Sequence, residues 1–475
     1  LYSCRRTAYD YVFVARFSAA EPVTALGDES LAPAFTISGR ITDAGTAAGL
    51  DGMALMFSNE GGSTTTSGGG YYAQPVAAGW SGTVTPVYVC GAFTPVMREY
   101  ADIQAEQTNQ DFEVQGLSAP ESFDLVGPTN GETAVDAVHL RWTAAPCAAE
   151  YDVYAGPNPS PAWLSKVETN ELIVALTNST VFYWHVVARN AAGETRSPAE
   201  GEWSFQGIRT MTITGTAAIV TNDWTYEDAA VVVDGGTVTI DGAHEFYSLR
   251  IINGGKVVHS AATASQVNQL DLTINDVLAI SSNSSIDVSG RGYLPGRTLG
   301  NTTNGASANN SGGSHGGLGG GSSPNVAYGD YQAPAAPGAG GAGSYASAGG
   351  GCVNLQAGTL ELAGAIRADG GPRPGNTSGG GAGGSIRIAA GMLSGNGSVS
   401  ACGGAGYGSG GGGGGGRIAL YFNDVNGFDL TNGVKAVGGT GGSLGGAGTI
   451  YWESANGLCK ELRLEGIGSA TGLTP

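Results

Sequence analysis

Residues 384–404 read GSIRIAAGMLSGNGSVSACGG: an apolar strand, a turn, a second short strand and an exit made of glycines. The same order of features returns in three other segments and, in shortened form, in a fourth: 269–292, 352–371, 417–439 and 449–466. One such unit cannot bury its apolar face alone, so consecutive units must stack on one another. The repeat therefore predicts a parallel β-helix, or β-solenoid, over residues 208–456.

The glycine exits align the second strands of the repeat. Four apolar residues fall at equivalent positions: Ile286, Ile366, Val399 and Val434. Because side chains alternate along a strand, we expect these four to point inward and the residues that follow them to point outward. The outward residues are Asp287, Arg367, Ser400 and Lys435. Glycosidic-bond chemistry needs paired carboxylates, which this mixed row lacks, so we expect no enzyme activity.

Glycine-rich excursions join the predicted rungs, and glycine makes up 83 of the 475 residues. The longest excursion runs from about Tyr293 to Gly351, and three short ones follow it: PRPGNTSGGGAG, AGYGSGGGGGGG and TGGSLGGAG. All leave the repeat at one corner, so they should emerge side by side. Such segments can pack as polyproline-II-like helices that hydrogen-bond to their neighbours, whereas an isolated glycine run is a flexible coil. Both an ordered polyglycine-II bundle and disordered loops remain open.

Short strands precede the repeat at intervals of about 8–12 residues, a spacing typical of small sandwiches. They predict two Ig-like β-sandwiches, at 36–116 and 117–207. Trp142 and Trp184 lie on alternating strands of the second and are expected in its core, with His185 beside them as a structural residue.

The two ends of the chain are less regular. Residues 1–35 read as an N-terminal linker with one strand-like stretch at 9–19, and residues 457–475 as a further rung or linker. The fold class predicted for the whole chain is all-β: two β-sandwiches followed by a β-helix with glycine-rich excursions.

Two stretches of the N-terminal half resemble known modules. ISGRITD, GLDGMALMFS and GYYAQPVAAGWSGTVTP resemble the carboxypeptidase regulatory-like (prealbumin-type) modules of secreted bacterial proteins. The strand that carries Trp142, with YDVY at 151–154 and YWHVVARNAAG at 183–193, resembles a fibronectin type III domain. The first resemblance implies a stalk or stabiliser without catalytic residues, and the second implies a fold but no particular function.

The glycine-rich half resembles a module of very large bacterial surface proteins. The strings that carry this resemblance are GGSIRI, LSGNGSVSA, GGGGGGGRIALYF and GGAGTIYW. By analogy, an ordered polyglycine bundle would be shared with certain phage tail adhesins and with the glycine-rich ectodomain of anaplastic lymphoma kinase. Together, the resemblances imply a multidomain bacterial cell-surface protein.

Charge and hydropathy exclude several classes of partner. The formal net charge is −19 and the 21 Lys and Arg residues are scattered, so the basic patch that nucleic acid requires is missing. No apolar run approaches the roughly 18 residues of a membrane span. An acidic, lysine-poor surface indicates an extracellular or cell-surface protein. The chain starts at Leu1, which predicts a processed product or a piece of a longer polypeptide.

Six cysteines favour disulfides formed in an oxidising compartment, with buried thiols as the alternative. One sequence does not give their pairing. None forms a CxxC pair and the histidines are isolated from them, so a zinc site is not expected. The disulfide candidates are Cys4, Cys90, Cys147, Cys352, Cys402 and Cys459.

Two ligand sites are weaker candidates. The segment FNDVNGFDL offers hard oxygen donors for Ca²⁺, although these residues also favour a plain solvated turn: Asn423, Asp424, Asn426 and Asp429. Four tyrosines of the long excursion lie among Gly, Ser and Asn, a composition suited to adaptable recognition; the alternative is that they simply wedge glycine strands together. They are Tyr293, Tyr328, Tyr331 and Tyr345.

Three functions follow from these features. The first is a structural protein that polymerises into a fibre, filament or surface layer, because the strand at 9–19 and the open ends of the β-helix are unpaired edges. The second is an adhesin that binds glycans or cell surfaces through the glycine-rich excursions. The third, a polysaccharide-active β-helix enzyme, is disfavoured by the missing carboxylate pairs.

Overall fold

The structure is a computed structural model that describes residues 34–87, 90–190, 192–372, 375–457, 459–464 and 466. The stretch 9–19 and Cys4 lie outside the described residues. Within them, every regular element is a strand apart from one three-residue 3-10 turn, η1 (Trp224–Tyr226). The predicted all-β class is confirmed. Contacts divide the chain into two compact units, and segments of the second sandwich belong to both.

The first sandwich consists of two four-stranded sheets. One contains, in order, β4 (Tyr71–Ala77), β1 (Ala34–Asp43), β8 (Phe112–Gln115) and β6 (Ala92–Thr94). The other contains β3 (Gly62–Thr65), β2 (Ala54–Phe57), β5 (Gly82–Val87) and β7 (Arg98–Tyr100). Alternation along the strands turns Ile37, Leu55 and Phe112 into a shared core, where each is fully buried.

The second sandwich combines a three-stranded and a six-stranded sheet. The smaller contains β14 (Glu171–Ala175), β11 (Ala137–Trp142) and β9 (Leu125–Gly127). The larger contains β10 (Glu132–Val135), β17 (Trp203–Ile208), β15 (Thr180–Asn190), β12 (Glu150–Gly156), β13 (Trp163–Val167) and, paired with β15, β16 (Gly193–Ser197). Trp142 and Trp184 are buried in its core, as predicted. His185 pairs with Glu202 at 2.8 Å and stacks on Tyr154.

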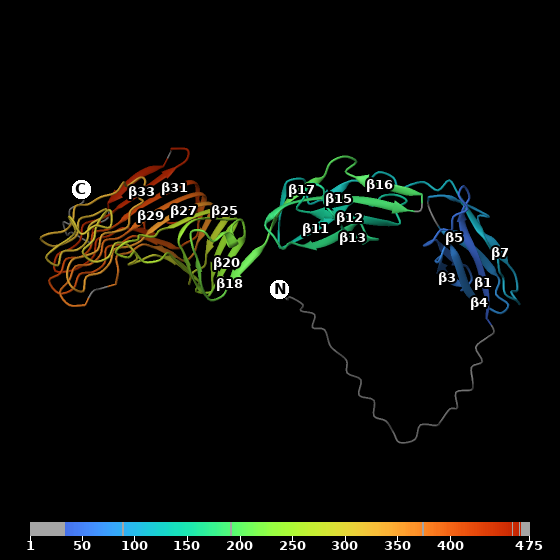
Figure 1. Ribbon diagram of the computed structural model, residues 1–475, viewed down its shortest axis with the longest axis horizontal. Coiled ribbons are helices and arrows are strands. Elements are labelled where there is room, and N and C mark those ends of the chain that lie inside the picture. The colour runs from blue at the N-terminus through green and yellow to red at the C-terminus, as the bar shows by residue number, and fades with distance from the viewer. Residues whose placement is uncertain are drawn as a thin grey trace, which may run out of the picture. The chain divides into compact units, whose positions relative to one another are not determined.

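From β18 onward the strands alternate between two parallel sheets, which we call the parallel coil (Figure 1). The large sheet contains β18 (Thr210–Ile213), β20 (Ala230–Asp234), β23 (Ser248–Ile252), β25 (Leu270–Ile280) with β22 (Gly242–Phe246) beside it, β27 (Cys352–Leu362), β29 (Ser385–Ser394), β31 (Arg417–Asn426), β33 (Thr449–Ser454) and β34 (Lys460–Leu464). The small sheet contains β19 (Thr216–Ile219), β21 (Thr237–Ile240), β24 (Lys256–Val258), β26 (Ser285–Asp287), β28 (Ala365–Arg367), β30 (Ser398–Ser400) and β32 (Val434–Lys435). Most turns of the chain thus add one strand to each sheet; the exceptions are β22 with β23 and β33 with β34, consecutive strands that both belong to the large sheet.

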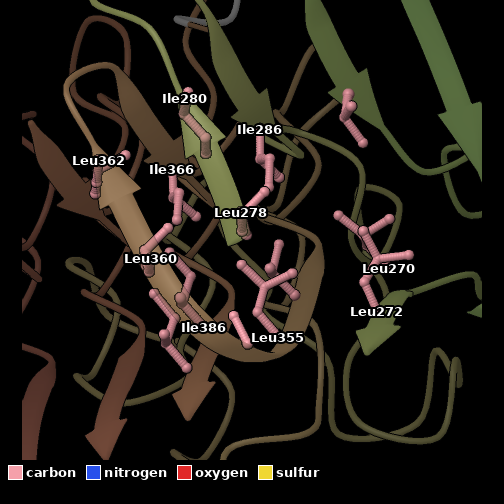
Figure 2. Close-up of a cluster of buried hydrophobic side chains, with 14 of the residues drawn as sticks. Leu270, Leu272, Leu278, Ile280, Ile286, Leu355, Leu360, Leu362, Ile366 and Ile386 are labelled. Atoms are coloured by element: carbon pink, nitrogen blue, oxygen red, sulfur yellow. The ribbon is translucent and has the colours of Figure 1, made fainter. Parts of the chain in front are cut away.

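The predicted register of the repeat is confirmed strand by strand. Ile286 pairs with Ile366, Ile366 with Val399, and Val399 with Val434. All four are at most 1% exposed, whereas Asp287, Arg367, Ser400 and Lys435 lie outside. Figure 2 shows Ile286 and Ile366 facing Leu278 and Leu360 of the large sheet. The coil is therefore held together by a continuous apolar column between its two sheets.

The end of the coil differs from the predicted rung or linker. After β33 the chain turns back, and β34 pairs antiparallel with β33, with Lys460 opposite Glu453. The turn contains Asn456-Gly457, a strong hairpin signal, and Gly457 has φ +67. Arg463 lies over the Trp452 ring and donates to the carbonyl oxygen of Val434 at 2.6 Å. Strand β34 thus pairs with the edge of β33, which the sequence predicts to be open, and is itself the last strand of the large sheet.

Candidate functional site

The run Gly410–Gly416 lies inside a bundle formed by the excursions. Its N–H groups donate hydrogen bonds of 2.7–2.9 Å to three neighbouring segments, and every third residue donates to the same segment. Gly411 and Gly414 donate to Asn310 and Gly313, Gly412 and Gly415 to Ser443 and Gly446, and Gly413 and Gly416 to Gly404 and Ala401. A period of three residues is that of a polyproline-II-like helix, which has no internal hydrogen bonds. The hydrogen bonds of this run thus have the spacing that the polyproline-II-like alternative requires.

The carbonyl oxygens of the same run accept hydrogen bonds from the excursions on its other sides. Gly411 and Gly414 accept from Gly380 and Gly383, Gly412 and Gly415 from Gly320 and Gly317, Gly410 and Gly413 from Gly442 and Gly439. Both kinds of backbone polar group are thereby satisfied without solvent, which a buried segment requires. We call this assembly of excursions the glycine bundle, residues 293–351, 371–372, 375–384, 403–416 and 438–448.

Close backbone contact explains why the run is made of glycine. A Cβ atom built on Gly411 would lie 1.8 Å from the carbonyl oxygen of Gly320, and one on Gly414 would lie 2.0 Å from that of Gly317. Atoms cannot approach so closely, and these neighbours are backbone that cannot swing aside. Glycine is required here because the neighbouring segments occupy the space of a side chain.

Polar side chains inside the glycine bundle are held by its backbone. Ser311, Ser314 and His315 are fully buried. The neutral His315 ring donates its Nδ1–H to the carbonyl oxygen of Gly383 at 2.9 Å, and its centroid lies 4.9 Å from that of Tyr328. Burial lowers the pKa of His315 to about 4. The imidazole is therefore uncharged at neutral pH and acts as a packing element.

The outer turns of four consecutive excursions lie side by side. We call these turns the turn row: residues 343–345, 375–378, 406–409 and 440–443. The N–H of Tyr345 donates to Ser378 Oγ at 3.3 Å, and the N–H of Tyr407 to the Ser378 carbonyl oxygen at 3.0 Å. Gly406 donates in turn to Thr440 at 2.7 Å. Figure 1 shows the yellow to orange excursions gathered beside the strands of the coil. Tyr345 is 60% exposed and Tyr407 43% exposed.

The structure separates the four tyrosines predicted as a binding surface. Tyr293 is buried, and its hydroxyl accepts a hydrogen bond from Gly300. Tyr328 donates to Pro337 at 2.6 Å, so both wedge the glycine bundle. Tyr331 lies edge-on to Tyr451, over the large sheet. Of the four, Tyr345 alone belongs to the turn row.

Tyr407 is the functional candidate that sequence reasoning missed. It lies in AGYGSG, the tip of a short excursion, much as Tyr345 lies in AGSYASAG near the end of the long one. Aligning the tips of successive excursions, instead of counting tyrosines within the longest, gives the signal that finds it.

The calcium candidates lie along one strand and the turn after it. Asn423, Asp424 and Asn426 are exposed residues of β31. The Asp429 carboxylate accepts from the N–H groups of Thr431 and Asn432 and from Asn432 Nδ2, at 2.8–2.9 Å, and the bonds from Asn432 are the main cause that lowers its pKa. Asp429 therefore caps its own turn. Among the described residues, no three His, Cys, Asp or Glu side chains cluster as metal ligands.

Of the six disulfide candidates, Cys90 and Cys147 form a disulfide, and both belong to the first unit. Among the described residues, Cys352, Cys402 and Cys459 form no disulfide. Cys352 begins β27 in the large sheet, whereas Cys402 follows β30 in the small sheet, so the apolar column separates them. Burial raises the pKa of the Cys352 thiol to about 12.

Comparison with known proteins gives likeness only to solved structures. No family model and no curated protein matches the chain. A fibronectin domain called FN3tt is 17% identical over 19% of this chain and 91% of its own, with a TM-score of 0.15. A DUF3823 family protein from Parabacteroides merdae is 13% identical over 37% of this chain and 100% of its own, with a TM-score of 0.17.

A third likeness is to the FN1–FN3 domains of chicken CNTN1, 11% identical over 38% of this chain and 68% of that chain, with a TM-score of 0.17. TM-scores of this size carry no argument about function. Within the described residues, no helix is long and apolar enough to cross a membrane.

Proposed function

We propose that this protein is a non-catalytic extracellular recognition protein of the adhesin type. In this proposal the parallel coil and the glycine bundle hold the turn row against a partner surface. The observation that carries the proposal is that Tyr345 and Tyr407 stand exposed on turns tied together through Ser378. Binding residues are commonly placed on loops that a rigid scaffold positions, and tyrosine provides large contact area at low entropic cost.

An extracellular location is supported by the disulfide between Cys90 and Cys147, because disulfides persist in oxidising compartments. A non-catalytic role is supported by the outward row of the small sheet. Its carboxylate, Asp287, is engaged by Lys256 Nζ at 2.9 Å. The neighbouring carboxylate, Asp369, accepts hydrogen bonds from Ser400 Oγ at 2.9 Å and from the Cys402 N–H at 2.6 Å, so both carboxylates are engaged by groups of the protein itself. Paired carboxylates are what glycosidic-bond hydrolysis needs.

Self-assembly into a fibre is the alternative. It needs free strand edges, and the two sheets end at β34 and β32. Strand β34 carries Lys460, Glu461 and Arg463, and charged residues on an edge strand oppose pairing with another chain, so β32 is the better contact for a second copy. Electron microscopy of concentrated purified protein tests this alternative, since regular filaments would support it and uniform single particles would exclude it.

The recognition proposal is tested by binding of labelled full-length protein to a printed array of glycans and extracellular-matrix proteins. The double variant Tyr345→Ser/Tyr407→Ser should lose the array signal while its melting temperature stays unchanged. The matched control is Val326→Ser, because Val326 is 81% exposed on the long excursion but lies outside the turn row. Equal signals from all three proteins would exclude the turn row as the binding surface.

A further inference from the structure

The outer face of the large sheet carries a groove of about 520 Å³ that crosses β27, β29, β31 and β33. One row of lining residues runs across the four strands, each residue paired with the next: Gln356 with Ala389, Ala389 with Tyr421, and Tyr421 with Glu453. Four strands at a spacing of about 4.8 Å make the groove roughly 14 Å long. We propose that this groove binds a short neutral oligosaccharide, a site separate from the turn row.

The ladder of the large sheet is interrupted along one line at the groove. Ala390 pairs with Phe422 and Met392 with Asp424, so the ladder skips Gly391 and Asn423. A Cβ atom on Gly391 would lie 2.5 Å from the carbonyl oxygen of Gly358, so this position admits only glycine. The missing side chain of Gly391, together with the small side chains of Ala389 and Ala390, leaves the floor open.

An aromatic ring is fixed in place at the side of the groove. The Tyr421 hydroxyl donates to the carbonyl oxygen of Gln332 at 2.7 Å, and the Arg387 guanidinium lies 5.2 Å from the ring centroid. The ring needs little ordering when a ligand arrives, and such preorganisation favours binding. An apolar ring edge beside polar groups suits the mixed apolar and hydroxylated surface of a sugar.

Two side-chain amides are available for hydrogen bonds to hydroxyl groups. Gln356 and Asn423 are both exposed and line the groove. Neither side chain has a hydrogen bond to the described residues of the protein. Each amide offers donors and acceptors together, which is the pattern that sugar hydroxyls match and that a simple anion or cation does not.

Glu453 is the charged residue in the lining of the groove, and its charge is compensated. The Glu453 carboxylate accepts a hydrogen bond from the Tyr451 hydroxyl and lies 3.4 Å from Lys460 Nζ. The bond from Tyr451 is the main cause that lowers the pKa of Glu453. This side chain is therefore ionised and paired with Lys460, so it provides no uncompensated charge for an acidic or basic ligand.

A peptide ligand fits the groove less well. The groove lies on the face of the large sheet, whose strand backbones already pair with one another across β27, β29, β31 and β33. Addition of a peptide strand needs an unpaired sheet edge. Recognition here must come from side chains, as it does for sugars.

The test is isothermal titration calorimetry of the full chain with neutral hexasaccharides (cellohexaose, mannohexaose and xylohexaose) and with hexagalacturonate as the acidic probe. We expect at least one neutral probe to bind and hexagalacturonate to bind at least about tenfold more weakly, a difference of about 1.4 kcal/mol. The double variant Gln356→Ala/Asn423→Ala should weaken neutral binding by about tenfold or more without changing the melting temperature, because both side chains are exposed.

Two further variants separate the groove from other surfaces. Tyr421→Phe keeps the ring and should bind the neutral probe within about threefold of the parent, whereas Tyr421→Ala should lose binding. The variant Tyr345→Ser/Tyr407→Ser should bind as the parent does, which distinguishes this site from the turn row. Absence of binding by all three neutral probes, tighter binding of hexagalacturonate, or unchanged binding by Gln356→Ala/Asn423→Ala would overturn the proposal.

Discussion

Gly414 donates its backbone N–H to the carbonyl oxygen of Gly313 at 2.8 Å, which ties a short excursion to the long one. Three residues earlier, Gly411 donates to Asn310, also three residues earlier on the partner segment. The two segments are therefore in phase, and the contact repeats with the period of a polyproline-II-like helix. Segments far apart in the sequence become one packed body because they share this period.

Replacing a glycine of the run should destabilise the glycine bundle. In Gly414→Ala the new methyl would meet the carbonyl oxygen of Gly317 at 2.0 Å, and overpacking of this kind costs about 1–3 kcal/mol or more. We expect a fall in melting temperature of several degrees by calorimetry. Gly375→Ala is the matched control, because its Cβ would meet nothing within 4 Å. Equal melting temperatures for the two variants would contradict the packed bundle.

Acid should weaken the structure through His315. Its pKa is about 4 in the folded protein and about 6.5 when unfolded, so the unfolded chain binds more protons between these values. The contribution of His315 to the free energy of unfolding is therefore fully present above pH 6.5. It falls by about 3 kcal/mol as the pH drops toward 4. Denaturant titrations at pH 7 and pH 4 measure the difference.

His315→Gln should flatten this pH dependence, since the variant has no group that titrates there. His139→Gln serves as the control, because His139 is exposed beside Glu171. A pH profile of His315→Gln that matches the parent's would show that the buried imidazole does not carry the effect.

Loss of the Cys90–Cys147 disulfide should destabilise the first unit. The two residues are separated by 57 positions, and a loop of that length predicts about 4 kcal/mol of stabilisation through the unfolded state. Urea unfolding of Cys90→Ser/Cys147→Ser measures the loss. Cys459→Ser should match the parent, since Cys459 is exposed and outside this bond. A decrease of less than about 1 kcal/mol in the free energy of unfolding would show that the disulfide contributes little to the stability of the first unit.

The antiparallel end of the coil should depend on Arg463. Its guanidinium donates to the carbonyl oxygens of Thr431 and Val434, and removing a donor from such groups costs about 1–3 kcal/mol. Arg463→Ala should speed hydrogen exchange of β33 amides, whereas Glu461→Ala, an exposed residue of the same strand, should not. Similar exchange in both variants would mean that Arg463 does not stabilise the end of the coil.

The repeat could be predicted from sequence because stacked rungs force equivalent residues into register, as at Ile286 and Ile366. The cap by β34 was not predicted, although Asn456-Gly457 carries the hairpin signal, because the preceding rungs favoured another parallel strand. The turn row and the groove depend on which excursions meet. Spacing within one excursion does not determine that Tyr345 and Tyr407 both contact Ser378.

The neighbouring segments should keep the glycine run ordered in solution. Backbone hydrogen exchange at Gly411–Gly416, followed by NMR on glycine-labelled protein, measures this order. Each N–H in this segment has a carbonyl partner, so we expect slow exchange, comparable with that of Ile418 in β31. Exchange of all six amides at the rate of an unstructured chain would contradict the packed bundle.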